Sequence, residues 1–167
     1  LNSCTFAPMA KKKKPTTVDV VVPCFNEEDS LPLFFASYTQ LAKSHPQYAF
    51  NIIVIDNGSS DSTLKIAKEF ISTTKVGICL ELSKNFGKEA SLTAGLEAST
   101  SELVIPLDAD LQDPIELIPT LIERWEQTGA DVVQRDFIDL PVPKSLWLMM
   151  LESNDDNCRT LVQTLME

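Results

Sequence analysis

The sequence predicts an α/β domain: a mostly parallel β-sheet with helices on both faces. Short apolar, β-branched runs alternate along the chain with helical patterns, as they do in consecutive βα units. The runs are almost continuously apolar, which is typical of strands buried on both sides. With 167 residues, 44% of them hydrophobic and 23% charged, the chain can bury one core.

Five apolar runs are the predicted strands. They are "VDVVVP" (18–23), "FNIIVID" (50–56), "VGICLEL" (76–82), "ELVIPLD" (102–108) and "ADVV" (130–133). Polar residues with turn-forming character follow the first four runs, so each run has the length of an ordinary strand.

Helical patterns fill the intervals between these runs. The first spans 31–43, with Asp29 or Ser30 as its N-cap. The second follows "SSDST", and the third, "GKEASLTAGLEAS", is rich in small residues suited to close packing. The fourth begins at Asp113, a capping residue followed by proline, and repeats apolar residues at helical spacing.

Charge and cysteine content narrow the possible functions. The net charge of −10 argues against a nucleic-acid partner, although a helix N-terminus or a metal ion can still bind an anion locally. The cysteines form no CxxC pair, and His45 is the single histidine, so the sequence favours neither a zinc site nor a histidine-based dyad. Scattered cysteines indicate a reducing, cytoplasmic environment.

The polar segments that follow the first four strands predict the site. They read "CFNEE", "DNGSSD", "SKNFGKE" and "DADLQD". Because ligands of parallel α/β sheets lie beyond the carboxyl ends of the strands, these segments are expected to meet at one edge.

The last of these segments has the character of a metal site. If the chain stays extended past Leu107, Asp108, Asp110 and Gln112 project to the same side. Their oxygen atoms suit Mg²⁺ or Mn²⁺, and two carboxylates leave coordination positions for phosphate oxygens. The alternative is a solvated loop, and for Asp113 a role as helix cap is the preferred interpretation.

The other segments offer groups for a nucleotide, each with a structural alternative. Asp56 ends a strand, where its carboxylate can accept N–H bonds from a nucleobase, while Ser60 or Asp61 caps the next helix. Lys84 and Lys88 lie at the same edge, where they can hold phosphates or be ordinary surface lysines.

Together, "VPCFNEE", "VIDNGSSDST", "LSKNFGKEASLTAGLEAS" and "PLDADLQDP" resemble the nucleotide-sugar half of family 2 glycosyltransferases. The likeness covers about 18–133 and points to the polyprenyl-phosphate, dolichol-phosphate mannose synthase-like group. It implies a GT-A (Rossmann-like) fold and inverting transfer of a sugar from a UDP- or GDP-sugar. It also implies Mg²⁺ or Mn²⁺, and a polyprenyl phosphate or cell-envelope glycan as acceptor.

The resemblance also implies roles for matching residues. Pro23, Phe25 and Glu27 would line the nucleoside pocket, with Asp56 and Asn57 beside the base. Asp108 and Asp110 would hold the metal and the diphosphate and carry catalysis, helped by Gln112, while Lys84 and Lys88 would contact the nucleotide. Asn57 stands where family members often have a second aspartate, and its amide still offers an acceptor oxygen.

The expected organisation is a disordered basic tail (1–16), a nucleotide-sugar-binding domain (17–135) and a poorly specified tail (136–167). After "GADVVQRD" the βα rhythm ends, so the fold is expected to be incomplete at its C-terminus, with uncovered apolar surface and self-association. A fragment that binds the donor without transferring sugar is therefore the alternative function.

The sequence also bears on other functions and locations. A dinucleotide-binding oxidoreductase is excluded because no GxGxxG follows the first strand. The sequence has no run of about 20 apolar residues. The tetralysine at 11–14 is better interpreted as a solvated tail than as a contact to the inner face of the membrane.

Overall fold

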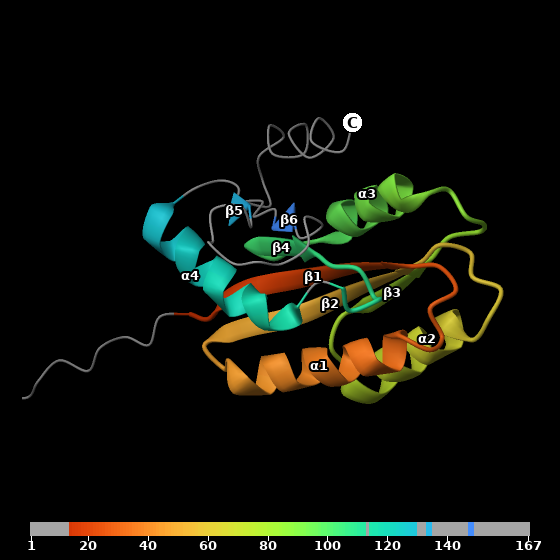
Figure 1. The fold of residues 1–167 in the computed structure, drawn as a ribbon, viewed down its shortest axis with the longest axis horizontal. Helices are drawn as coiled ribbons and strands as arrows, with labels where there is room; N and C mark the ends of the chain where they lie inside the picture. The colour runs from red at the N-terminus through yellow and green to blue at the C-terminus, as the bar shows by residue number, and fades with distance from the viewer. Residues whose placement is uncertain (1–13, 113, 130–132, 135–146, 149–167) are drawn as a thin grey trace, which may run out of the picture.

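The computed structural model describes residues 14–112, 114–129, 133–134 and 147–148 (Figure 1). The strands β1 (Thr16–Cys24), β2 (Tyr48–Asp56), β3 (Ile78–Glu81) and β4 (Leu103–Pro106) form one parallel sheet in the order β3-β2-β1-β4. A two-residue strand β5 (Val133–Gln134) pairs antiparallel with β6 (Trp147–Leu148). The predicted parallel sheet is thus confirmed.

Helices cover both faces of this sheet (Figure 1). They are α1 (Leu31–Ser44), α2 (Thr63–Thr74), α3 (Lys88–Ala98) and α4 (Ile118–Thr128), the last preceded by a 3₁₀ turn at Ile115–Leu117. α1 and α2 lie against one face, and α3 lies against the other.

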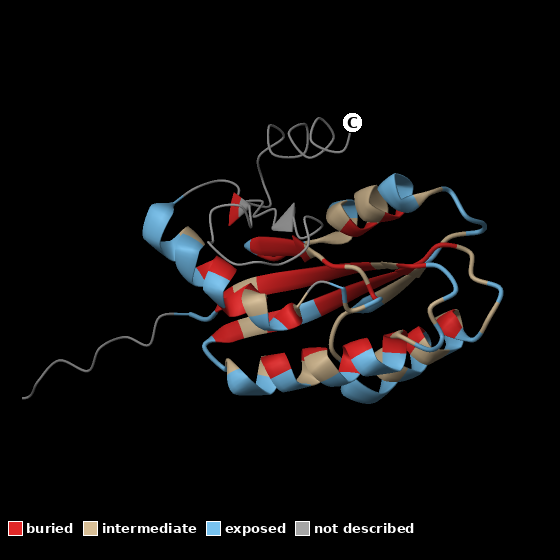
Figure 2. Ribbon diagram, in the orientation of Figure 1, coloured by how far each residue is buried: buried red, intermediate tan, exposed pale blue. Residues whose placement is uncertain are grey.

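Alternation along β1 produces two apolar cores. Val18, Val20 and Val22 belong to the larger core, which includes α1 and α4, whereas Val21 belongs to the smaller core with Leu92 and Leu96 of α3. Because successive side chains of a strand point to opposite faces, one continuous apolar run supplies both cores. β1, β2 and β4 are accordingly buried through most of their length (Figure 2), whereas the residues of the edge strand β3 are half-buried or exposed.

The chain order of the strands creates a crevice beside β1. The path runs from β1 through α1 to β2 and through α2 to β3, and α3 then returns it across the opposite face to β4. β1 therefore lies between two strands whose connections leave in opposite directions. In open α/β sheets, ligands bind at the carboxyl ends of such a strand pair.

Some boundaries differ from the predicted ones. β3 begins at Ile78 rather than at residue 76, because Gly77 has φ +83° and packs so closely that a Cβ there would lie 1.9 Å from the Ile52 carbonyl oxygen. α4 begins at Ile118, later than predicted, after the 3₁₀ turn and with Pro119 in its first turn, where the missing N–H costs nothing.

Some predicted features lie outside the described residues. These are Asp113, most of the fifth predicted strand, and the two tails apart from the residues at 14–16 and 147–148. Within the described part of the chain, no helix has both the length and the apolar character needed to cross a bilayer.

Gly95 allows α3 to pack closely on the sheet, and its replacement tests this contact. A Cβ at Gly95 would lie 2.4 Å from Val21 Cγ1 and 2.8 Å from Ile55 Cδ1. Overpacking of this kind costs about 1–3 kcal/mol, against a gain of about 1 kcal/mol in helix propensity from alanine. We expect Gly95→Ala to lower the free energy of unfolding by about 1 kcal/mol in urea denaturation.

The exposed Ala90 on the same helix provides the control. Ala90→Gly measures helix propensity alone and is expected to cost about 1 kcal/mol. If Gly95→Ala stabilised the protein by the same amount, the close contact between α3 and the sheet would be refuted.

Candidate functional site

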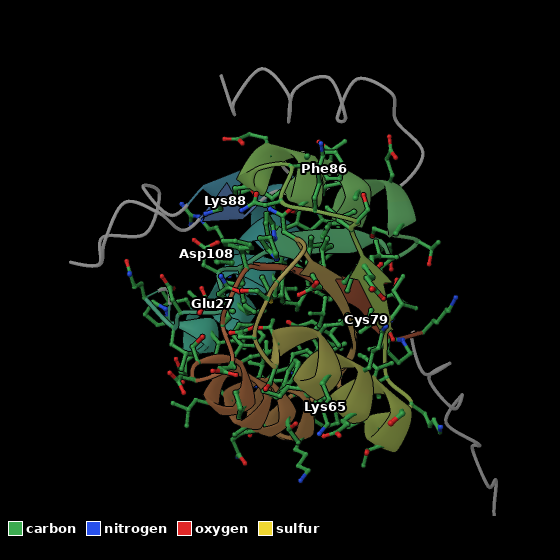
Figure 3. The ribbon with its side chains drawn as sticks, turned by 90° about the vertical axis from the view of Figure 1, so that its right-hand side faces the viewer. Glu27, Lys65, Cys79, Phe86, Lys88 and Asp108 are labelled. Carbon is green, nitrogen blue, oxygen red and sulfur yellow. The ribbon has the colours of Figure 1, made fainter. Side chains whose placement is uncertain are left out.

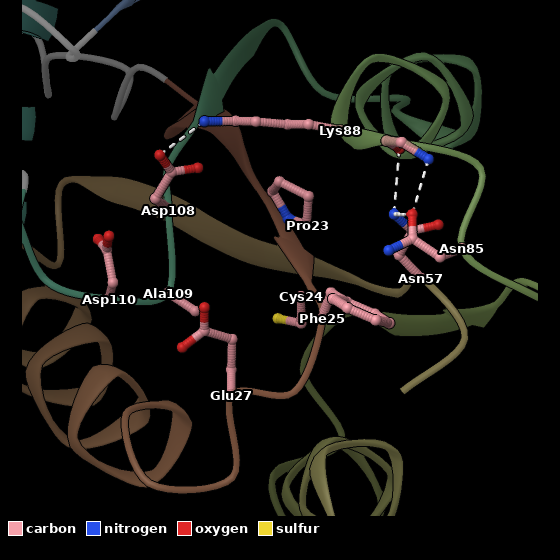
Figure 4. A pocket seen from close by; sticks show the side chains of 11 residues that line it. Pro23, Cys24, Phe25, Glu27, Asn57, Asn85, Lys88, Asp108, Ala109 and Asp110 are labelled. Atoms are coloured by element: carbon pink, nitrogen blue, oxygen red, sulfur yellow. Dashed lines mark hydrogen bonds and ion pairs between the residues drawn. The ribbon is translucent and has the colours of Figure 1, made fainter. Parts of the chain in front are cut away.

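The predicted polar segments meet at the carboxyl edge of the sheet, which Figure 3 views directly. They surround a cleft of about 390 Å³. Its lining residues are Pro23, Cys24, Phe25, Glu27, Asn57, Asn85, Gly87, Lys88, Asp108, Ala109 and Asp110 (Figure 4).

Asp108 and Asp110 reach the cleft through a turn, and the extended conformation predicted past Leu107 is wrong. Leu107 N–H donates to the Val21 carbonyl at 2.9 Å, which continues the β1–β4 pairing by one residue. Ala109 is 2% exposed, and Leu111 has φ +60°, a left-handed conformation that ends any extended alternation. Both carboxylates line the cleft in spite of this turn.

Gln112 takes a different position from the two aspartates. Its backbone N–H donates to Asp110 Oδ1 at 3.1 Å, and the residue is exposed. Gln112 is not among the residues that line the cleft, because the turn at Ala109–Leu111 breaks the spacing on which its predicted direction depended.

Lys88 crosses the cleft to Asp108 (Figure 4). Its Nζ lies 2.7 Å from Asp108 Oδ2, and the side chains are 57% and 30% exposed, respectively. A pair with this exposure contributes only about 0–1 kcal/mol to stability. The ion pair therefore matters for geometry more than for stability: the Lys88 ammonium and the carboxylates of Asp108 and Asp110 lie together in the cleft.

Hydrogen bonds lock the loop after β1 to the loop after β2. Asn26 has φ +56°, its N–H donates to Ser59 Oγ at 3.0 Å, and its Oδ1 accepts Ser60 N–H at 2.9 Å. Glu27 N–H donates to Thr63 Oγ1 at 2.7 Å. Asparagine tolerates this backbone conformation better than most residues, so "FNEE" holds a fixed shape at the edge of the cleft.

Asp61 and Glu28 add further hydrogen bonds between the same two loops. Asp61 Oδ1 accepts Thr63 N–H at 3.0 Å, although the N-cap position of α2 is Ser62 and not the predicted Ser60 or Asp61, and its Oδ2 accepts Glu28 N–H at 3.2 Å. Slight burial opposes ionisation of Asp61, but the hydrogen bonds from Thr63 and Glu28 outweigh it and lower the pKa. Glu28 Oε2 accepts Ser62 N–H at 3.0 Å.

The β1 side of the cleft combines apolar and acidic groups. Pro23 and Phe25 line it, Phe25 being 44% exposed, and the Glu27 carboxylate accepts the hydroxyl of Ser30. Cys24 is 2% exposed; burial, followed by the charges of Glu27 and Asp56, raises the pKa of its thiol far above the ordinary value. Cys24 is thus a buried neutral side chain, as predicted.

Asp56 lies at the end of β2 with one carboxylate oxygen unused. The residue is 2% exposed, and its Oδ2 accepts Ser59 N–H at 3.2 Å. Its Oδ1 is buried without a hydrogen-bond partner among the described residues. A buried acceptor without a donor costs free energy, so Oδ1 is a candidate acceptor for a ligand N–H.

Asn57 joins β2 to the 83–87 loop between β3 and α3. Its Nδ2 donates to Asn85 Oδ1 and to the Gly87 carbonyl, both at 3.1 Å, and its Oδ1 accepts Phe86 N–H at 2.9 Å. Both N–H donors of the amide and one acceptor position of its oxygen are thus used within the protein, although Asn57 also lines the cleft.

Lys84 and Lys88 belong to one motif, but their side chains lie in different places. Lys84 Nζ lies 5.1 Å from the centroid of the Phe86 ring, a cation–π contact. Neither Lys84 nor Phe86 lines the cleft, and Phe86 is 52% exposed. Of the predicted site residues, Asp56, Lys84 and Gln112 do not line the cleft, while the others do.

Sequence reasoning missed several residues of the cleft. They are Cys24, Asn85, Gly87 and Ala109. Gly87 has φ +93°, and Asn85 Oδ1 accepts its N–H at 2.9 Å. The Asn and Gly of "NFG" are turn residues, which was the available signal that this loop has a fixed conformation.

The profile of glycosyl transferase family 2 matches residues 19–151, most of the chain. The chain belongs to glycosyl transferase family 2. The matched segment includes the described cleft and continues beyond residue 135, the predicted end of the domain.

Curated relatives are similar to about 70% of the chain. It is 44% identical over 116 residues to a bactoprenol glucosyl transferase of Shigella phage SfX, covering 70% of this chain and 37% of the relative. It is 43% identical over 126 residues to an undecaprenyl-phosphate 4-deoxy-4-formamido-L-arabinose transferase of Pseudomonas aeruginosa, covering 72% and 36%. The chain thus spans little more than a third of the length of these relatives.

Solved structures confirm the predicted GT-A fold of this family 2 chain. A mannosyltransferase from Pyrobaculum calidifontis in complex with GDP-Man and Mn²⁺ superposes with a TM-score of 0.59 at 20% identity, covering 72% of this chain and 36% of that chain. TarS from S. aureus in complex with UDP-GlcNAc gives 0.59 at 22% identity, covering 71% and 34%.

Proposed function

We propose that this chain is the nucleotide-sugar-binding part of an inverting, metal-dependent glycosyltransferase that acts on a polyprenyl phosphate. The observation that carries the proposal is the meeting of Asp108, Asp110 and Lys88 in one cleft at the carboxyl ends of β1 and β4. Membership of family 2 makes sugar transfer the chemistry that this cleft fits.

The donor set suits a divalent cation held jointly with a diphosphate. Asp108 and Asp110 offer carboxylate oxygens, which Mg²⁺ and Mn²⁺ prefer. Among the described residues no group of three His, Cys, Asp or Glu is placed to hold a metal alone. Phosphate and water oxygens would complete the coordination, as in sites where Mg²⁺ is bound with substrate. When bound, the cation would stabilise the charge of the departing diphosphate.

The remaining cleft residues, together with Asp56 next to Asn57, provide for the rest of the donor. The unpaired Asp56 Oδ1 would accept a nucleobase N–H, for which uracil and guanine both qualify. Phe25, Pro23 and Glu27 would form the wall on the nucleoside side, and the Lys88 ammonium would meet a phosphate oxygen. Lys84 and Gln112 would have to move from their described positions to take part.

The relatives support a lipid phosphate as acceptor. Two of them are named for bactoprenol and for undecaprenyl phosphate. A phosphate oxygen would bond to the anomeric carbon while the bond from that carbon to the nucleoside diphosphate breaks on the opposite side. The electron pair would leave with the diphosphate, and the anomeric configuration would invert. Because a phosphate monoester is already anionic near pH 7, this attack needs less help from a general base than attack by a hydroxyl.

Calorimetry with UDP and with GDP, each with MnCl₂, MgCl₂ or EDTA, tests the donor site. We expect one of the two nucleotides to bind in a metal-dependent manner, and Asp110→Ala to weaken this binding about 10-fold or more. The absence of binding to the wild-type chain, or unchanged binding in Asp110→Ala, would sink the proposal.

Transfer itself needs a separate assay with the full-length protein. Radiolabelled sugar from the matching nucleotide sugar should appear in the organic phase with undecaprenyl phosphate as acceptor. Donor binding without any transfer would instead favour the interpretation of a donor-binding protein.

A further inference from the structure

We propose that Asn57 is a positioning residue: its side-chain amide fixes the 83–87 loop and so places the Lys88 ammonium in the cleft. This inference rests on the proposed function, since it assigns Lys88 to the diphosphate of the donor. It differs from the predicted contact between Asn57 and the base.

The hydrogen bonds of Asn57 define which end of its amide faces which partner. The Gly87 carbonyl can only accept and the Phe86 N–H can only donate, so Nδ2 must face Gly87 and Oδ1 must face Phe86. All three bonds of this buried amide end on residues 85–87. Both N–H donors of the amide are therefore used within the protein, and Oδ1 keeps one acceptor position.

The loop that Asn57 holds leads directly to Lys88. Gly87 is the N-cap of α3, and Lys88 is the first residue of the helix. Fixing the Gly87 carbonyl therefore fixes the start of α3 and the base of the lysine side chain. From there Lys88 Nζ reaches Asp108 Oδ2 at 2.7 Å. Figure 4 shows the amide pair and the lysine on the same side of the cleft.

A close backbone contact reinforces the same junction. Gly58, next to Asn57, has φ +73°, and a Cβ there would lie 2.5 Å from the backbone carbon of Lys84. The turn after β2 and the 83–87 loop thus pack without space for a side chain, so little movement is left once the Asn57 bonds have formed.

The donors and acceptors in these hydrogen bonds predict that an aspartate is tolerated at position 85 but not at position 57. Asn57→Asp removes both N–H donors and sets a carboxylate against two oxygen acceptors. Asn85→Asp keeps the oxygen that accepts from Asn57 Nδ2 and from Gly87 N–H, so the loop should stay in place. Asn51→Asp, at an exposed position of β2, provides the same substitution away from the loop.

A double-mutant cycle with Lys88→Met separates positioning from base contact. The probes are the nucleoside diphosphate that binds the wild-type chain, UDP or GDP, and its nucleoside, followed by NMR. We expect Asn57→Asp to weaken diphosphate binding about 10-fold in the wild-type background and less than about 2-fold in Lys88→Met, because residues that act through a shared backbone segment couple. Nucleoside binding should stay unchanged, as should all binding in Asn51→Asp. Equal losses for nucleoside and diphosphate, or additive effects with Lys88→Met, would overturn the inference in favour of a base contact.

Hydrogen exchange tests the loop without any ligand. Amides of 84–88 should exchange faster in Asn57→Asp than in wild type, Asn85→Asp or Asn51→Asp, and unchanged exchange refutes the positioning role. If the wild-type chain binds neither nucleotide, the proposed function fails, while exchange still decides the role of Asn57. Should Asn57→Asp fail to fold, Asn85→Ala removes the contact from the exposed side of the loop and takes its place in both measurements.

Discussion

Replacing Asp108 by asparagine is expected to abolish the metal dependence of nucleotide binding. The Asp108 carboxylate lines the cleft and pairs with Lys88, and in the proposed function it binds the cation. Asparagine keeps the shape and one oxygen but removes the negative charge, so Mn²⁺ loses an anionic ligand. Even groups that only orient a ligand alter metal affinity about 10–100-fold, so we expect a loss of at least about 100-fold in Mn²⁺-dependent affinity.

The pattern across conditions identifies the cause of that loss. Lys88 remains in Asp108→Asn and is released from its partner, so weak binding of the diphosphate in EDTA should persist. Calorimetry with and without Mn²⁺ should therefore give nearly equal affinities for the variant and widely different ones for the wild type. Asp29→Asn, an exposed aspartate outside the cleft lining, should behave as wild type. A variant that kept the full Mn²⁺ effect would remove Asp108 from the metal site.

Asp110→Ala should have a smaller effect than Asp108→Asn. Asp110 is exposed, and its Oδ1 accepts the Gln112 N–H within the turn, whereas Asp108 is less accessible and carries the ion pair. The first aspartate of the pair is thus held by the continuing β1–β4 pairing and by Lys88, and the second depends on the shape of the turn.

The sheet and the place of the site could be predicted because they follow from local patterns. Apolar runs of strand length alternate with helical ones, and the polar segments after four of the runs all reach the carboxyl edge. β1 and β2 even extend beyond their predicted ends, since Thr16 and Tyr48 are buried as well.

The details that could not be predicted depend on single backbone angles and on long-range partners. Leu111 has φ +60°, which nothing in a leucine indicates, and this turn separates Gln112 from the two aspartates. Asn57 lies in a motif whose likeness suggested a base contact, but its partners come from a loop about 30 residues later. A pattern of residue types identifies candidates for a site, but it does not show which of their polar atoms the fold itself already uses.

Asp19 is the clearest case of such a long-range requirement, and its removal should cost most of all in stability. It is an aspartate within the apolar run of β1, only 3% exposed. Its Oδ2 accepts Ser99 Oγ at 2.7 Å, Thr100 N–H at 3.0 Å and Ser101 N–H at 3.1 Å, and its Oδ1 accepts Ser101 Oγ at 2.8 Å. One carboxylate thus organises the connection from α3 to β4.

We expect Asp19→Ala to lower the free energy of unfolding by about 3 kcal/mol. Two buried donors of Ser101 would lose their acceptor, at roughly 1–3 kcal/mol each, partly offset by the relief of no longer burying a carboxylate. Because domains of this size are stable by only about 5–15 kcal/mol, urea denaturation followed by circular dichroism should show a clear shift. Asp19→Asn should destabilise less, since its oxygen can keep the bonds made to Oδ2 while its NH₂ group donates to the Ser101 hydroxyl, which can also accept.

A neighbouring bond gives the matched control for this prediction. Thr17 Oγ1 accepts Glu102 N–H at 2.9 Å, a single neutral bond between the same two segments at an exposed position. Thr17→Val should cost about 1 kcal/mol or less. If Asp19→Ala cost no more than Thr17→Val, the buried carboxylate would not be what holds the α3–β4 connection to β1. The placement of Asp108 would then have to depend on β-sheet pairing alone, since β4 leads from that connection directly into the cleft.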